Sequence, residues 1–204
     1  MNTNKAILPS SYFPPASHFV VMNMLDTNIE LNENYQKRSI RNRCSILAAN
    51  GPLHLSVPLL KGRTKQLMKN VRISYAENWM SNHCKSIRSA YGTSPYYDFY
   101  FESICTIINS EYQYLHELNH HILLYFNELG LIPEFSYSQE FIPNDQFDGF
   151  DLRAKNCDLQ ITSPEYEQVF GFKFGFVQNL SILDLLFNLG PETIQWLRDS
   201  KLNV

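Results

Sequence analysis

Residues 6–32, AILPSSYFPPASHFVVMNMLDTNIELN, decide the fold that we expect for this chain. The apolar run at 6–8 predicts a strand, and the Pro-Pro pair that follows makes a rigid turn favouring the start of a helix. We expect this helix over residues 16–25. Residues 28–32 then alternate polar and apolar side chains, which is the period of a half-buried strand. A strand, a helix and a second strand in this order favour parallel pairing of the two strands.

A β-hairpin and a helical half are expected next. Residues 43–49 and 53–59 are strand-like runs joined by an Asn-Gly turn, which tolerates the positive φ values of tight hairpins. Residues 71–75 alternate as one more strand, with Tyr75 among the side chains that we expect in the core. The spacing of apolar residues predicts three helices and a closing strand, over 78–90, 96–111, 114–129 and 132–141.

The whole chain is expected to form an α/β fold. A mixed sheet opens with the β-α-β unit and the hairpin, a helical half follows, and a C-terminal helical appendage closes the chain. We expect an α/β core with a basic face over residues 1–141, an irregular linker over 142–165 and a C-terminal helical segment packing on the core over 166–204. Within the last segment, Ser181-Ile-Leu-Asp184 has the form of a capping box at a helix start.

The composition is typical of a folded soluble protein. The 204 residues are 44% hydrophobic and 18% charged, and a chain of this length can bury a substantial core. No segment approaches the roughly 20 apolar residues that span a bilayer, and the first residues lack the apolar run of a signal peptide. The four cysteines are scattered without a Cys-x-x-Cys pair, which favours free thiols in a reducing compartment. We therefore expect a cytoplasmic protein without membrane insertion.

Positive charge is concentrated in one part of the chain, where nine Lys or Arg and no Asp or Glu lie between residues 34 and 76. Residues 35–43, YQKRSIRNR, form the basic segment and carry four of these cations. Arginine suits phosphate because its planar fork presents paired donors, so we expect an anion-binding face. The ligand-binding residues expected there are Tyr35, Gln36, Lys37, Arg38, Arg41, Asn42 and Arg43. The alternative is a solvated edge strand whose charges prevent edge-to-edge pairing.

A second candidate group is an aromatic pair on one helix. Trp79 and His83 are four residues apart and therefore share a helix face. His83 is the candidate catalytic residue, as a general acid or base, with Trp79 and Tyr12 as walls of the ligand site. The alternative is a buried aromatic pair whose histidine is satisfied by a backbone carbonyl.

Metal and cofactor chemistry find little support in the sequence. His116 and His120 are one helical turn apart with Glu117 beside the first, but no third ligand is evident, so a polar helix face is the simpler interpretation. No GxSxG, P-loop or GxGxxG motif occurs. His18 and His54 belong to no motif and stay unassigned. We expect no metal and no cofactor.

Several short motifs occur in order over nearly the whole chain. They are YFPP at 12–15, YQKR at 35–38, RNR at 41–43, ANGP at 49–52, Trp79 with His83, Tyr91 with SPY at 94–96, and NLSILDLLFNLGPE at 179–192. Together these motifs resemble the WbqC-like family, and most closely its Bacteroidetes-type members. The resemblance implies a link to surface polysaccharides, because the family takes its name from a protein of bacterial O-antigen gene clusters.

The resemblance also marks a difference in the first loop. Other branches of the family open with a strand followed by His-Gln-Pro-Asn-Tyr-Phe-Pro-Trp, which is similar to the His-bearing phosphate loop of nucleotidylyltransferases. The corresponding residues 8–15 of this chain read LPSSYFPP and lack that His. For this chain, the resemblance therefore does not extend to a nucleotidyl-transfer mechanism that uses the His.

The basic segment and the resemblance together predict a function. We expect a protein that binds a phosphorylated or nucleotide-activated sugar in bacterial surface-polysaccharide (O-antigen-type) biosynthesis. If the protein is an enzyme, we expect a transferase of polysaccharide biosynthesis. The sequence does not identify the reaction that it would catalyse. The alternative is a non-catalytic binding module for an anionic partner such as nucleic acid or an acidic protein. Nucleic acid is the weaker partner, because few aromatic residues are interleaved with the cations.

Overall fold

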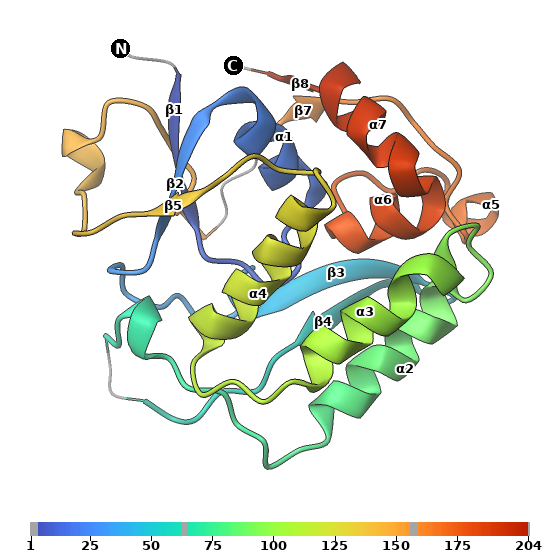
Figure 1. Ribbon diagram of the computed structural model, residues 1–204, viewed down its shortest axis with the longest axis horizontal. Helices are drawn as coiled ribbons and strands as arrows, with labels where there is room; N and C mark the ends of the chain where they lie inside the picture. Colours follow the sequence, from blue (N-terminus) through green and yellow to red (C-terminus); the bar gives the residue numbers. More distant parts are fainter. Residues whose placement is uncertain (1–3, 63–64, 156–158, 204) are drawn as a thin grey trace.

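The architecture is that of a computed structural model, which describes residues 4–62, 65–155 and 159–203. The strands are β1 (Lys5–Pro9), β2 (Asp26–Glu30), β3 (Arg43–Ala48), β4 (Gly51–Ser56), β5 (Ser136–Tyr137), β6 (Phe150–Asp151), β7 (Ile161–Thr162) and β8 (Lys201–Leu202). The helices are α1 (Ala16–Met24), α2 (Trp79–Tyr91), α3 (Tyr97–Asn109), α4 (Leu115–Glu128), α5 (Gly171–Phe174), α6 (Ile182–Leu189) and α7 (Thr193–Asp199). Short 3-10 turns lie at Met68–Asn70, Asn144–Gln146 and Gly190–Glu192. The α/β class expected from the sequence is confirmed (Figure 1).

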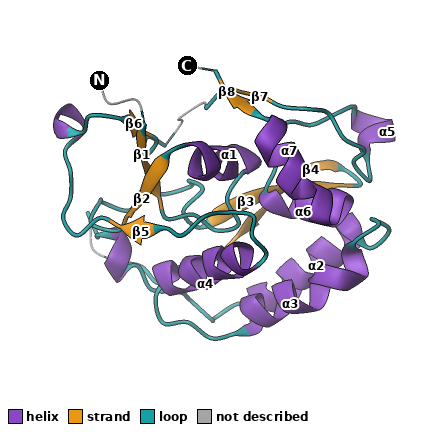
Figure 2. Ribbon diagram, turned by 45° about the horizontal axis from the view of Figure 1, so that its top comes forward, coloured by secondary structure: helices purple, strands orange, loops and turns teal. Residues whose placement is uncertain are grey.

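A parallel sheet with the strand order β5-β2-β1-β6 lies at the N-terminal end of the molecule (Figure 2). β1 and β2 pair with Leu8 opposite Ile29, so the expected β-α-β opening is confirmed. After its first residue β1 is buried throughout, as expected for a strand covered on both faces. α1 connects β1 to β2, whereas β6 lies on the other side of β1. The strand order therefore reverses between β1 and β6.

The expected hairpin is formed by β3 and β4, which pair antiparallel with Ala48 opposite Gly51. Gly51 has a φ of 104°, a value that glycine adopts without steric cost. In Figure 1 the hairpin runs between α6 on one side and α2 and α3 on the other, and β3 contacts both α2 and α6. The three helices expected after the hairpin are present as α2, α3 and α4.

Two expected strands are shorter in the structure. Residues 71–75 form only isolated bridges, from Ile73 to Leu59 on one side and from Arg72 to Tyr114 on the other. The Tyr75 side chain, expected in the core, is 37% exposed. Of residues 132–141, only β5 pairs with the sheet. A proline near the start of that segment cannot donate a ladder hydrogen bond, which shortens the pairing.

The later segments are packed against the N-terminal half. Residues 142–165, expected as an irregular linker, contribute β6 to the parallel sheet. α6 and α7 pack on α1, and α6 also contacts α2 and α3. Leu183, Leu185 and Phe187 of α6 are fully buried. The division into core, linker and C-terminal segment stays a prediction, and β6 shows that part of the expected linker belongs to the sheet.

Ser181 caps α6, but Asp184 does not. The Ser181 hydroxyl accepts a hydrogen bond from a backbone N–H in the first turn of α6, as expected. The Asp184 carboxylate instead accepts hydrogen bonds from three distant side chains, namely Tyr91 at 2.9 Å, Tyr166 at 2.6 Å and Gln168 at 2.8 Å. Burial raises the pKa of Asp184. The capping-box prediction was wrong for this carboxylate because side chains distant in the sequence hydrogen-bond to it.

Candidate functional site

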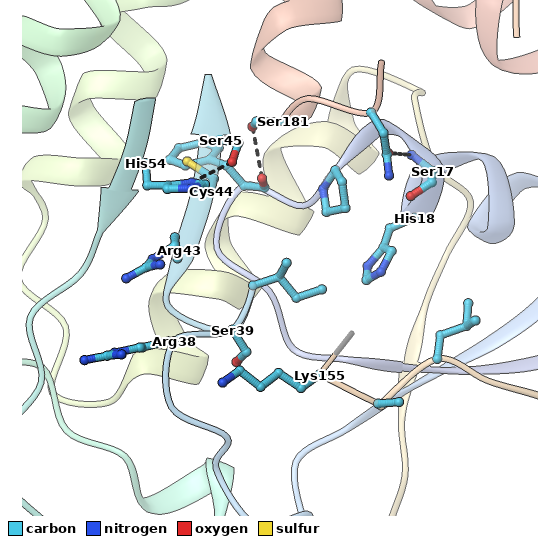
Figure 3. A pocket seen from close by; sticks show the side chains of 16 residues that line it. Ser17, His18, Arg38, Ser39, Arg43, Cys44, Ser45, His54, Lys155 and Ser181 are labelled. Atoms are coloured by element: carbon cyan, nitrogen blue, oxygen red, sulfur yellow. Dashed lines mark hydrogen bonds between the residues drawn. The ribbon is translucent and has the colours of Figure 1, made fainter. Parts of the chain in front are cut away.

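A cavity of about 310 Å³ opens beside the N-terminus of α1 (Figure 3). Its walls come from the turn after β1, the first turn of α1, the basic segment, the hairpin, the segment after β6 and the turn before α6. This volume lies at the lower end of the range for small-molecule sites, about 300–1,000 Å³. Basic side chains contribute much of the lining, namely those of Arg38, Arg43, Lys155, His18 and His54.

The cavity lies outside the carboxyl ends of β1 and β6. Phe13 and His18 come from the chain just after β1, and Leu152 and Lys155 come from the chain just after β6. The strand order of the sheet reverses between these two strands. In open α/β sheets, ligands bind in the crevice that forms at such a reversal. The fold therefore marks this cavity as the candidate ligand site.

The mouth of the cavity is positively charged. Arg38 and Lys155 are exposed, and the half-buried Arg43 donates from Nε to the Ser56 hydroxyl at 2.9 Å. In Figure 3 Arg38 and Arg43 extend in the same direction, and Lys155 reaches toward Ser39 from the opposite wall. Within the described part of the chain, no Asp or Glu lines the cavity. Such a lining favours an anionic ligand.

A tight turn presents Arg38 to the cavity. Its φ is 55°, a left-handed value that is uncommon for residues other than glycine. The Ser39 hydroxyl fixes this turn by donating to the carbonyl of Gln36 at 2.6 Å. Strained backbone of this kind clusters at ligand sites, where the surrounding structure holds a side chain in a required direction.

The N-terminus of α1 reaches the cavity with its first amide groups already paired. The backbone N–H of Ala16 donates to the carbonyl of Leu180 at 2.9 Å, and that of Ser17 donates to the side-chain oxygen of Asn179 at 3.0 Å. The helix dipole still favours negative charge at this end. Ligand contacts in the cavity must therefore come chiefly from side chains.

His18, in the first turn of α1, lines the cavity and is only 6% exposed. Burial, followed by the charge of Arg41, lowers the pKa of His18 to about 4. The imidazole is therefore neutral near pH 7. Among the described residues, none shares a hydrogen bond with this ring.

Arg41 does not line the cavity and is fully buried in an ion-pair cluster. Its guanidinium donates to both carboxylate oxygens of Glu33, at 2.7 and 2.6 Å, and to the carbonyl of Arg153 at 2.8 Å. Arg153 in turn pairs with Asp151 and Glu30. Arg41 and Arg43, both expected at the anion-binding face, have different surroundings because the basic segment forms turns rather than an extended strand.

Tyr12, Trp79 and His83 are buried together away from the cavity. The Tyr12 hydroxyl and Nδ1 of His83 share a hydrogen bond of 2.8 Å, and the Ser56 carbonyl also bonds to His83. The rings of Trp79 and His83 meet edge to face at 5.1 Å. Burial lowers the pKa of His83 to about 4. This is the geometry of the alternative, a buried aromatic pair with a satisfied histidine, so we leave these three residues out of the site proposed below.

The remaining predicted site residues lie around a second cavity or in solvent. Tyr35 and Gln36 line a cavity of about 380 Å³ next to Arg153. The Tyr35 hydroxyl donates to Asn42 at 2.8 Å, and Gln36 donates to the Arg153 carbonyl at 3.0 Å. The first bond lies within the basic segment, and the second joins that segment to the segment after β6. Lys37 is exposed and lines neither cavity.

Sequence reasoning missed His18, His54 and Lys155 among the basic side chains that line the candidate cavity. His18 belongs to no motif, and Lys155 lies in a stretch whose nearby charges are mostly acidic. No sequence spacing links His18 to Lys155, because the two residues are brought to the same cavity by the pairing of β1 with β6. A prediction that β6 joins the sheet beside β1 would have drawn attention to the residue that follows it.

Two further features, a metal site and a membrane-spanning helix, are absent from the described residues. No group of three or more His, Cys, Asp or Glu side chains there is placed to hold a metal ion. His120 and His121 hydrogen-bond instead to Tyr137 at 2.8 Å and to the Glu117 carbonyl at 2.9 Å. None of the helices in that part of the chain has the length and apolar character needed to cross a membrane.

Fold and site together define an α/β protein with a cation-lined cavity at the carboxyl edge of a parallel sheet. Comparison with protein families gives this class a name. The profile of the WbqC-like protein family matches residues 10–158 and 138–196, and the chain belongs to that family.

A curated relative matches the chain along almost its whole length. It is the "Uncharacterized protein Rv1507c" of Mycobacterium tuberculosis (strain ATCC 25618 / H37Rv), with 26% identity over 227 aligned residues. The alignment covers 95% of this chain and 96% of the relative. No solved structure matches the chain.

Proposed function

We propose that the cavity binds the phosphate of a phosphorylated or nucleotide-activated sugar through Arg38, Arg43 and Lys155. One observation carries the proposal: three cations from two segments far apart in the sequence line one cavity at the reversal of strand order. The cavity lining that the structure describes contains no carboxylate to neutralise them.

The chemistry of the lining suits such a ligand. The planar forks of Arg38 and Arg43 can each present two parallel N–H groups to phosphate oxygens, whereas Lys155 acts as a point charge. The hydroxyl group of Ser17 adds a neutral hydrogen-bonding position suited to a sugar. The half-buried Arg43 is expected to contribute most, because it is better shielded from solvent than the other two cations.

This ligand class fits a role in bacterial surface-polysaccharide biosynthesis of the O-antigen type. Membership of the WbqC-like family and the charge of the cavity support this role. The protein would act in the cytoplasm, where activated sugars are made. If the protein is an enzyme, the proposed activity is that of a transferase acting on the bound sugar phosphate.

A binding titration with a matched control tests the proposal. Arg43→Ala is compared with Lys37→Ala, because Lys37 is an exposed cation of the same basic segment that does not line the cavity. The probe is UDP-glucose, measured by calorimetry and by thermal shift. Arg43→Ala is expected to weaken binding about tenfold or more, since a hydrogen bond to a charged group contributes about 1.5–3 kcal/mol. Lys37→Ala is expected to bind like the unchanged protein.

Equal loss in both variants would assign binding to diffuse charge and not to the cavity. The alternative function, an anionic macromolecule on the basic segment, predicts a different pattern. Single-stranded RNA would then bind with a steep dependence on salt, and UDP-glucose would have no effect. That pattern would overturn the proposal.

A further inference from the structure

His18 differs from the buried His83 in what surrounds its ring. His83 is hydrogen-bonded to Tyr12 and to a backbone carbonyl. His18 is equally buried, at 6% exposure against 5%, but none of the described residues shares a hydrogen bond with its imidazole. The His18 ring nitrogens are not among the fully buried unpartnered atoms of the described residues, which indicates that they reach the cavity. The ring lines the cavity, where a ligand can supply a hydrogen-bond partner.

The charges facing His18 all oppose its protonation. Arg41 acts on it from the basic segment, and Arg38 and Arg43 of the same segment line the same cavity. Lys155 faces the cavity from the segment after β6, and His54 faces it from β4. The positive end of the α1 dipole adds to them. Burial first, and then the charge of Arg41, lowers the pKa of His18 and keeps the ring neutral.

We infer that His18 is a ligand-binding residue at the base of the cavity and that it takes up one proton when a tetrahedral oxyanion enters. The inference rests on the proposed function, since it requires an anion in the cavity. An oxyanion offsets the charge of Arg38, Arg43 and Lys155 and accepts a hydrogen bond from the imidazolium. Both effects favour the charged ring, which then donates to the ligand.

Proton uptake fixes the direction of the pH dependence. The pKa of His18 is about 4 in the free protein and is raised in the complex. Affinity is therefore highest at low pH and falls as pH rises from the free pKa to the pKa of the complex. Within that window each pH unit weakens binding by up to about tenfold, because one proton is linked to each ligand.

Sulfate is the probe that isolates this effect, because it stays a dianion over the whole range whereas phosphate titrates. Calorimetry from about pH 5.5 to about pH 7.5, in buffers of different ionisation enthalpy, counts the protons taken up. The unchanged protein is compared with His18→Gln, and His121→Gln is the matched control because His121 is exposed, bonds to the Glu117 carbonyl and does not line the cavity. We expect net proton uptake, of up to one proton per sulfate, in the unchanged protein and in His121→Gln, and none in His18→Gln.

Nitrogen-15 spectra of the unchanged protein give a second readout that needs no variant. Addition of sulfate near pH 6 is expected to move the His18 ring signals from the neutral to the protonated pattern. Sulfate binding without proton uptake, or uptake that persists in His18→Gln, would overturn the inference and leave the anion site in place. Absence of any sulfate or UDP-glucose binding, even near pH 5.5, would remove the anion site and the inference together.

Discussion

Arg41 and Arg43 are two residues apart and have opposite surroundings. The Arg41 guanidinium is fully buried and holds both oxygens of Glu33, whereas Arg43 reaches the cavity and is tied to Ser56. Burial raises the pKa of Glu33, and the bond to Arg41 opposes that rise. The first arginine therefore belongs to the internal structure and the second is available to a ligand.

Removal of Arg41 is expected to act on stability. Arg41→Met leaves the Glu33 carboxylate buried without its cation, and breaking a buried pair in this way costs about 3–5 kcal/mol. Urea unfolding near neutral pH measures the loss. Arg72→Met is the control, because Arg72 is an exposed arginine of the same acid-free span. If Arg41→Met were no less stable than Arg72→Met, the ion-pair assignment would fail.

At the scale of elements, the turn before α6 holds the start of α1 in place. Asn179 and Leu180 accept hydrogen bonds from the first amides of α1, and the Ser181 hydroxyl donates to the Phe13 carbonyl at 3.0 Å. The backbone N–H of Ser181 donates to Ser45 of β3 at 2.8 Å. One turn thus positions three walls of the cavity.

Asn179 offers a test of this turn because it has a left-handed φ of 54° as well as its bond to Ser17. Asn179→Gly removes the bond but keeps the backbone conformation, so a loss of about 1 kcal/mol is expected. Asn179→Ala removes the bond and adds strain of about 1 kcal/mol more. Thermal unfolding of the two variants separates these contributions. Equal stability of the two variants would show that the φ value has no energetic consequence.

At the scale of the molecule, the C-terminal segment is joined to the rest of the fold by buried contacts. Asp184 of α6 accepts a hydrogen bond from Tyr91 of α2, and α1 packs against both α6 and α7. The buried face of α6 completes the core that β3 and α2 begin. We therefore expect the C-terminal segment to unfold together with the rest of the fold.

The two tryptophans allow that expectation to be measured, since Trp79 begins α2 and Trp196 lies in α7. Both are buried, so their fluorescence reports local unfolding. In Trp196→Phe the remaining signal follows the core, and in Trp79→Phe it follows the C-terminal segment. For each variant we expect the fluorescence midpoint in urea to coincide with its far-ultraviolet circular dichroism. Separate midpoints within one variant would show that the C-terminal segment is an independent unit.

The amino-acid sequence determined those features that depend on near neighbours. The β-α-β opening, the hairpin at Gly51 and the helices α2, α3 and α4 follow from side-chain periodicity and turn chemistry, which act over a few residues. The concentration of cations between residues 34 and 76 is likewise visible without any structure.

Only the tertiary structure decided which of those cations a ligand can reach. The ion pair of Arg41 with Glu33 and the hydrogen bond of Tyr91 to Asp184 form in the folded chain and correspond to no local sequence pattern. Lys155 and His18 share a cavity because β6 pairs with β1 across a long sequence separation. Side-chain partners in a core are set by long-range packing, so a charge pattern that locates a basic face does not by itself locate the residues of its site.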